Sequence, residues 1–303
     1  MRPARRSLGA LIAVAAALVA VGCGSTSRPT TNPTTTPATS PSTTGVTSSI
    51  RPPLTTTITT QAEAQTADVR VYYLHGDTLG VAHRTITATP RVAAAAMTEL
   101  LAGPTPADRA AGLTTTIPAG TRLLAVTIAD GTATVDLTST FESGGGSLSM
   151  AARLAQVTFT LTQFPTVARV VFNVDGKPVA VFGGEGIILD HPATRTSFET
   201  LTPAILVEYP GGGWAVQSPL RIAGSANVFE AQFQAELTDA SGAVIGRQAI
   251  HATAGTGTRG TFDTTLPFTV ATSGPGLLTV FDTSPKDGTR IDVVQLPLQL
   301  VAP

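Results

Sequence analysis

A stretch rich in threonine, proline and serine, from Gly24 to about Gln65, limits how much of this chain can fold. The stretch has almost no apolar periodicity, so it cannot bury enough surface to offset the entropy lost on ordering. We therefore expect residues 23–66 to form a disordered tether. The folded body is then confined to the remaining residues up to Pro303, which is enough chain for two domains of ordinary size.

The residues before the tether predict a secretory signal peptide over residues 1–22. Three arginines precede an uncharged run of Ala, Val, Leu and Ile from Leu8 to Val21, which is too short for a comfortable membrane span. The run ends at Cys23, the only cysteine in the chain. Small residues before this cysteine resemble a bacterial lipobox, which implies lipidation (palmitate) at Cys23. An ordinary secretory signal in which Cys23 is incidental is the alternative.

Lipidation would make this an extracytoplasmic protein, anchored to the cell membrane by lipid rather than by a spanning helix. The chain has 19 basic and 20 acidic residues, and no Lys/Arg block follows the signal peptide. We therefore expect no nucleic-acid partner. The sequence leaves the oligomeric state open.

Residues 67–200 predict an α+β domain. Two runs have the spacing and composition of helices, and the other runs are β-rich and separated by turns such as Asp130-Gly131 and Asp175-Gly176. The expected strands are Val69–Leu74, Leu79–Thr87, Leu124–Ile128, Ala133–Leu137, Val167–Val174 and Lys177–Phe182, and the expected helices are Val92–Ala102 and Ser147–Thr162. This order predicts a mixed sheet with two helices on one of its faces.

Several short motifs occur in order in this region. They are Leu100–Pro104, Ile117–Thr121, Ala133–Leu137, Phe141, Gln156–Thr162 and Val174–Gly176. Together they resemble the GerMN domain, which is named from bacterial sporulation and spore-germination proteins. That family is related in fold to ring-building modules of secretion and sporulation assemblies and is not known for catalysis. The resemblance, over about Asp68 to Glu199, therefore implies a binding or assembly module.

Residues 203–303 predict an all-β sandwich, because seven short β-rich runs alternate with turn residues and no helix pattern intervenes. The expected strands are Ile205–Glu208, Leu220–Ala226, Ala231–Thr238, Val244–Ala252, Gly260–Leu266, Gly276–Asp282 and Ile291–Leu300. The expected core residues are Phe229, Phe233, Leu237, Phe262, Leu266, Leu278 and Val280. Pro297, inside the last run, favours an edge strand or a bulge.

This region also carries a series of motifs. They are Tyr209-Pro210, Ser218–Leu220, Gly224–Ala231, Asp239–Gly242, Gly260–Phe262 and Ser284–Gly288. They resemble the immunoglobulin-like domain associated with bacterial spore-germination proteins. A GerMN domain followed by this sandwich is a recurrent pairing, so the two resemblances support each other.

No pattern predicts a catalytic residue, a metal or a cofactor. The four histidines lack further ligands at metal-binding spacing, and we interpret them as surface or loop residues. They are His75, His83, His191 and His251. Gly144–Gly146 lacks the Lys and Ser/Thr of a phosphate loop and is interpreted as a hinge. Asp282, Asp287 and Asp292 lack the spacing of a calcium loop.

Three other carboxylates draw attention. Asp175 is explained by its turn with Gly176, and Asp136 ends a strand, where it can bond the following loop. Glu230 is a candidate to pair with an arginine across the sandwich.

The sequence thus predicts a non-enzymatic, membrane-tethered protein of the cell envelope that binds another envelope protein or the cell wall. A hydrolase acting on peptidoglycan is an alternative, against which the lack of a nucleophile, metal or paired-acid motif counts. A small-ligand-binding lipoprotein is a third reading, which a cavity above about 300 Å³ with convergent polar groups would favour.

The anchoring hypothesis gives the first prediction. Replacing Cys23 by Ala removes the sulfur that would carry the lipid, so the variant should leave the membrane fraction or stall in processing. Fractionation of cells followed by immunoblotting measures this, with Ser27→Ala as a control within the tether. Mature Cys23→Ala protein in the membrane fraction would contradict the assignment.

Overall fold

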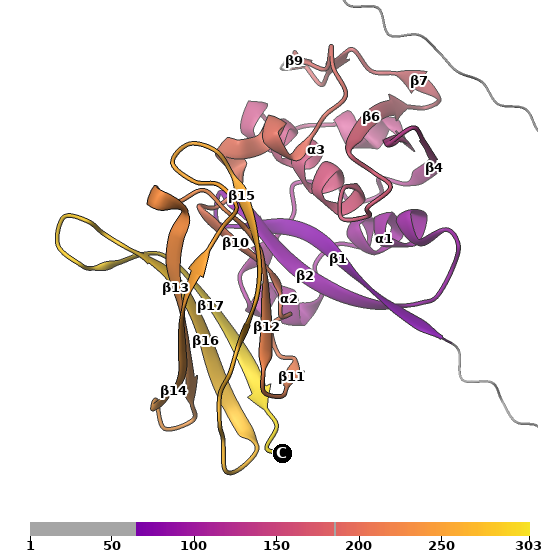
Figure 1. The fold of residues 1–303 in the computed structure, drawn as a ribbon. Coiled ribbons are helices and arrows are strands. Elements are labelled where there is room, and N and C mark those ends of the chain that lie inside the picture. The colour runs from indigo at the N-terminus through magenta and orange to yellow at the C-terminus, as the bar shows by residue number, and fades with distance from the viewer. Residues whose placement is uncertain (1–64, 185) are drawn as a thin grey trace, which may run out of the picture. The chain divides into compact units, whose positions relative to one another are not determined.

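The computed structural model describes residues 65–184 and 186–303, coloured from indigo to yellow in Figure 1. The predicted signal peptide, Cys23 and all but the last two residues of the predicted tether lie outside the described residues. These described residues belong to one compact unit. Within it, a first domain of residues 66–201 is followed by a second domain of residues 205–300.

The first domain opens with a long antiparallel hairpin. β1 (Thr66–His75) pairs with β2 (Thr78–Thr87) along its whole length. Gly76 closes the two-residue turn at a φ of 61°, which a residue without a Cβ adopts freely. The short β3 (Leu113–Thr114) pairs with the end of β1, giving a three-stranded sheet in the order β2-β1-β3.

A second sheet of this domain is mixed. Its order is β4-β5-β6-β7, with β5 and β6 parallel and the outer pairs antiparallel. The bounds are Leu123–Ala129 for β4, Thr132–Leu137 for β5, Arg169–Val174 for β6 and Lys177–Pro178 for β7. The predicted strand Lys177–Phe182 is divided, because its end forms β8 (Val181–Phe182), which pairs with β9 (Ile187–Ile188) in a separate hairpin.

The two predicted helices are present as α1 (Val92–Leu101) and α3 (Ser147–Leu161). α1 contacts β1 and β4, and α3 contacts β1 and β6, so the helices join two sheets around one core instead of covering one face of one sheet. A third helix, α2 (Pro106–Ala110), lies in a segment expected as loop. Thr105 and Asp108 cap its start reciprocally, a signal that the sequence already carries.

α3 carries a buried cation. Arg153 is 3% exposed, and no carboxylate of the described chain pairs with it. Its guanidinium donates to four backbone carbonyl oxygens over 2.7–2.9 Å, those of Thr116, Phe141, Ser143 and Gly144. Burial lowers the pKa of Arg153. A Cβ at Gly145 would lie 2.8 Å from the Arg153 Nη2 atom, so the predicted glycine hinge is a loop wrapped around this side chain.

The second domain is a β-sandwich. One sheet has the order β10-β12-β15, and the other the order β11-β17-β16-β13-β14. The bounds are β10 Ile205–Tyr209, β11 Ala215–Val216, β12 Leu220–Ala226, β13 Gln232–Asp239, β14 Val244–His251, β15 Gly260–Leu266, β16 Gly274–Thr283 and β17 Arg290–Leu300. The seven predicted strands are confirmed, and the two-residue β11 is additional.

Short 3-10 helices complete the secondary structure described here, at Ser139–Glu142, Arg195–Leu201 and Phe229–Ala231.

Six of the seven predicted core residues of the sandwich are buried. Phe229 is the exception at 58% exposed, so its assignment to the core is wrong. The reason is local, because Glu230 and Ala231 both have positive φ and form a tight turn. Phe229 lies before this turn and so does not follow the alternation of inward and outward side chains along β13.

The carbonyl cage around Arg153 gives the second prediction. Arg153→Met would leave four carbonyls without their donor, so we expect the free energy of unfolding to fall by about 3 kcal/mol. Urea denaturation followed by far-UV circular dichroism measures it. The control Arg169→Met changes an exposed side chain that donates to Thr132 Oγ1, and its cost should stay below about 1 kcal/mol. Equal losses in the two variants would show that the cage is not stabilising.

Candidate binding cleft

The two domains meet at Glu208, near the end of β10. The Tyr72 hydroxyl donates a short hydrogen bond to Glu208 Oε1, and Arg195 Nη1 donates to the same oxygen at 2.7 Å. Arg195 Nη2 and Arg70 Nε each lie 3.1 Å from the Tyr72 hydroxyl oxygen. Arg70 and Tyr72 are two residues apart on β1, so they point from one face of that strand towards the second domain.

The charges of this cluster are balanced inside the protein. Burial alone would raise the pKa of Glu208, but Arg195, Arg70 and the Tyr72 hydroxyl outweigh it and hold this pKa below its usual value. Burial also raises the pKa of Tyr72, which keeps its hydroxyl protonated as a donor. The Arg195 guanidinium additionally lies 4.7 Å from the centre of the Phe159 ring. Breaking this partly buried pair leaves an uncompensated charge.

His83 forms a second contact between the domains. Its side chain is 7% exposed, with Nδ1 2.8 Å from Asp68 Oδ2 and Nε2 3.0 Å from the Glu208 backbone oxygen. The imidazole also packs edge-on against two aromatic rings. Its centre lies 4.5 Å from that of Trp214 and 5.3 Å from that of Tyr209. The prediction of a surface or loop histidine is therefore wrong for His83.

A third contact lies at the connection between the domains. Arg259 Nε donates to Glu199 Oε2 at 2.9 Å, and Arg259 Nη2 donates to the Pro203 carbonyl at 2.9 Å. Asn227 Nδ2 donates to Glu199 Oε1 at 2.9 Å. Residues of the second domain thus hold the end of the first domain through a side chain and a backbone carbonyl.

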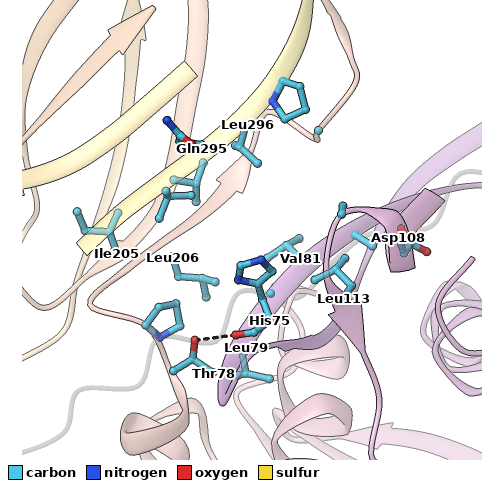
Figure 2. Close-up of a pocket in the computed structure, with 18 of the residues that line it drawn as sticks. His75, Thr78, Leu79, Val81, Asp108, Leu113, Ile205, Leu206, Gln295 and Leu296 are labelled. Carbon is cyan, nitrogen blue, oxygen red and sulfur yellow. Dashed lines mark hydrogen bonds between the residues drawn. The ribbon is translucent and has the colours of Figure 1, made fainter. Parts of the chain in front are cut away.

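Beside these contacts lies a cavity of about 590 Å³. Figure 2 shows His75, Val81 and Leu113 of the first domain facing Leu206 and Leu296 of the second across it. The wider lining consists of Thr78–His83 from the hairpin, Ala107, Asp108 and Ala111 around α2, Pro203–Val207 at the start of β10, Gly212–Trp214, and Asp292–Pro297 from β17. The cavity therefore exists only because the two domains are held together.

Some polar side chains of the lining are already engaged. Asp108 bonds Arg84 and caps α2, and His83 is held as described above. In the described chain, His75, Asp292 and Gln295 are lining residues whose side chains have no hydrogen bond or ion pair to another residue. Partial burial and the neighbouring Asp282 carboxylate raise the pKa of Asp292. The cleft thus offers an apolar surface with a few free polar groups.

Asp136, Asp175 and Glu230 are not among the residues that line this cleft. Asp175 and Gly176 make the predicted turn, and Asp136 Oδ1 accepts a hydrogen bond from the Gly176 amide at 3.0 Å, not from the loop after its own strand. Asp175 Oδ1 in turn accepts from the Ser139 amide at 3.2 Å. These bonds tie the end of β5 to the β6–β7 turn, which is a structural role.

Glu230 does not pair with an arginine in the described chain, so that expectation is wrong. The acid that does so is Glu236, which is buried and bonds both Arg247 and Arg290. Glu236 lies on regular β13, whereas Glu230 sits in the turn of positive φ before it, which removes it from the strand alternation. No group of three or more His, Cys, Asp or Glu residues within 65–184 and 186–303 is placed to hold a metal ion.

Sequence reasoning missed Tyr72, His83 and Glu208 as partners. A weak signal was available in Trp214, the only tryptophan of the chain, which follows three consecutive glycines. Gly211 lets this ring come close, since a Cβ there would lie 2.7 Å from the indole and 2.8 Å from His83.

Among the residues that the structure describes, no helix is both long and apolar enough to cross a bilayer.

Two family comparisons match consecutive parts of the chain. Residues 70–180 match the Germane family, described as sporulation and spore germination. Residues 204–289 match the Gmad2 family, described as the immunoglobulin-like domain of bacterial spore germination. No curated protein matches the chain. Both resemblances drawn from the sequence motifs are thereby confirmed.

Three solved structures are similar to parts of the chain. The first GerMN domain of the sporulation protein GerM from Bacillus subtilis is 24% identical, over 43% of this chain and 98% of its own, with a TM-score of 0.36. The tandem GerMN domains of the same protein are 15% identical, over 78% of this chain and 61% of theirs, with a TM-score of 0.39. A putative lipoprotein from Clostridium perfringens is 20% identical, over 45% of this chain and 93% of its own, with a TM-score of 0.33.

The Glu208 cluster gives the third prediction. Glu208→Gln should lower the free energy of unfolding by about 2 kcal/mol at pH 7, because it leaves two partly buried arginines without their anion. The folded-state pKa of Glu208 lies below its unfolded value, so this contribution is complete above the unfolded pKa of about 4.3 and is lost as the pH falls through the folded pKa.

Denaturation at several pH values between about 3 and 7 measures this difference, which should shrink towards the acid end. The control is Asp263→Asn, whose pair with Arg221 is 54% and 60% exposed and should contribute less than about 1 kcal/mol. A pH-independent difference for Glu208→Gln would contradict the assigned role.

Proposed function

For a chain that joins a Germane domain to a spore-germination-type immunoglobulin-like domain, we propose a non-catalytic binding role in the cell envelope. In this proposal the protein is tethered to the membrane by a lipid on Cys23 and stands away from it on residues 23–66. Its partner is another envelope protein or the cell wall.

The observation that carries this proposal is the cleft between the domains. Its walls are mainly apolar, and its polar groups with fixed positions, such as His83 and Asp108, are engaged in bonds that hold the fold. Catalysis requires a nucleophile, base or metal with oriented neighbours and a place for the reacting atoms. The cleft instead offers what binding requires, a preformed concave surface with free polar groups in its lining.

A small-ligand-binding lipoprotein is a second candidate, favoured by one observation. The cavity of about 590 Å³ exceeds the roughly 300 Å³ at which ligand pockets begin. Against this candidate, the free polar residues come from two separate walls of the cleft, His75 from β1 and the pair Asp292 and Gln295 from β17.

The fourth prediction tests binding in the cleft. A photo-crosslinking amino acid at the exposed Ala107 of α2, which lines the cleft, should give a defined covalent adduct in intact cells. The same amino acid at Thr258, which is exposed and outside the cleft lining, is the control and should not give that adduct. Identical adduct patterns from the two positions would argue against the cleft as the binding surface.

A parallel assay addresses the absence of catalysis. Purified protein lacking residues 1–64 should show no turnover of peptidoglycan or of ester, phosphate and glycoside reporters. Turnover that is lost in Asp136→Asn, Asp175→Asn or Glu230→Gln, with folding intact, would overturn the non-catalytic assignment.

A further inference from the structure

β17 has one strand edge without a partner along much of its length. On one side β17 pairs with β16 throughout, whereas on the other side β11 covers only Gln299 and Leu300. Beyond β11, the Gly213 amide still donates to the Pro297 carbonyl at 2.7 Å. Residues 290–296 of β17 therefore have no strand beside them on this outer side in the described chain.

The unpaired edge faces the cavity. All six consecutive residues from Asp292 to Pro297 line it, whereas a strand that presents a face would expose only alternate residues. The same holds for the five residues Pro203–Val207, which include the first three residues of β10, an outermost strand of its sheet. The cavity thus lies between the edges of two strands, closed on a third side by the β1–β2 hairpin (Figure 2).

Backbone alternation places hydrogen-bonding groups on this edge. The Gln299 amide donates to the Trp214 carbonyl at 2.8 Å, and the Pro297 carbonyl accepts from Gly213, so both residues direct their backbone groups away from β16. Gln295, two residues earlier, directs its amide and carbonyl the same way. Proline at 297 is tolerated because its missing N–H belongs to this outer edge, as expected from the sequence.

A bulge brings a carboxylate to the same place. Val280 of β16 pairs with Val294 of β17, and the next pair is Asp282 with Ile291. Asp292 and Val293 therefore together oppose one residue of β16. Asp292 has a φ of 51°, an unusual value for a residue with a Cβ. Val293 is 47% exposed beside it. The free edge therefore carries an apolar side chain and an acid that has no ion pair in the described chain.

We propose that the cleft binds an extended, largely apolar segment of a partner polypeptide that carries one basic side chain. The segment adds as a strand to the β17 edge at Gln295, packs apolar side chains against Leu206 and Leu296, and places its cation at Asp292. An unpaired strand edge recognises a backbone, which a small ligand does not supply, and the acid selects a positive charge. This inference rests on the proposed function, since it specifies the partner's chemistry at the same cleft.

The test uses a panel of fluorescein-labelled octapeptides in which valine and threonine alternate and one position is lysine, glutamate or glutamine. Fluorescence anisotropy with purified protein lacking residues 1–64 should show binding of the lysine peptides. Gln295→Pro, which removes the edge-directed amide, should weaken it at least about tenfold, the equivalent of a lost backbone hydrogen bond. Gln295→Ala keeps that amide and should bind like the parent.

Two further comparisons separate strand addition from other uses of the cleft. Ala107→Trp fills the cleft and should abolish binding, whereas Ala110→Trp on the same exposed helix, outside the cleft lining, should not. Asp292→Asn should remove the preference for lysine over glutamine, and Asp287→Asn, outside the cleft lining, should keep it. A lysine peptide with an N-methylated backbone provides the same test on the parent protein, should Gln295→Pro fail to fold. This peptide should not bind.

Parent-like binding by a folded Gln295→Pro variant, or by the N-methylated peptide, overturns strand addition and leaves a cleft that binds by shape alone. A panel without any binding peptide overturns it as well. The proposed function is judged separately, by the crosslinked adduct from position 107, so the two can fail independently.

Discussion

The ion pair between Glu208 and Arg195 is the interaction on which the arrangement of the two domains depends. A carboxylate and a guanidinium that leave water lose much solvation, which only good geometry and further hydrogen bonds restore. Here the Tyr72 hydroxyl supplies the further hydrogen bond to the carboxylate. The Glu208 backbone oxygen is also hydrogen-bonded to His83 Nε2. One residue of β10 thus fixes the hairpin of the first domain through both its side chain and its main chain.

The cleft is a consequence of that fixed arrangement. Its walls come from elements far apart in the chain, and neither domain alone encloses it. Any ligand that fills it would stabilise the docked arrangement by mass action, and loss of the Glu208 cluster would weaken ligand binding without removing a direct contact. In the proposed function, binding in the cleft and docking of the two domains are therefore coupled.

Several features that look like sites in the sequence serve the fold. The glycine-rich loop before α3 wraps around the Arg153 guanidinium, because close backbone approach is possible only without side chains there. Asp136 and Asp175 bond backbone amides across a turn. These polar and glycine-rich motifs thus satisfy backbone hydrogen-bonding groups within the first domain.

The sequence by itself determined the local structure: all seven strands of the sandwich, the hairpin turns and both long helices follow from alternation, turn residues and helical spacing, which act over a few residues. The capping box of α2 was equally readable, although it was overlooked. Only the tertiary structure decided that the first domain divides into two sheets, that the His83 side chain is just 7% exposed, and that Tyr72 meets Glu208 across 136 positions. Those outcomes depend on which faces and edges meet, and pairing between distant residues leaves no trace in the periodicity of either segment.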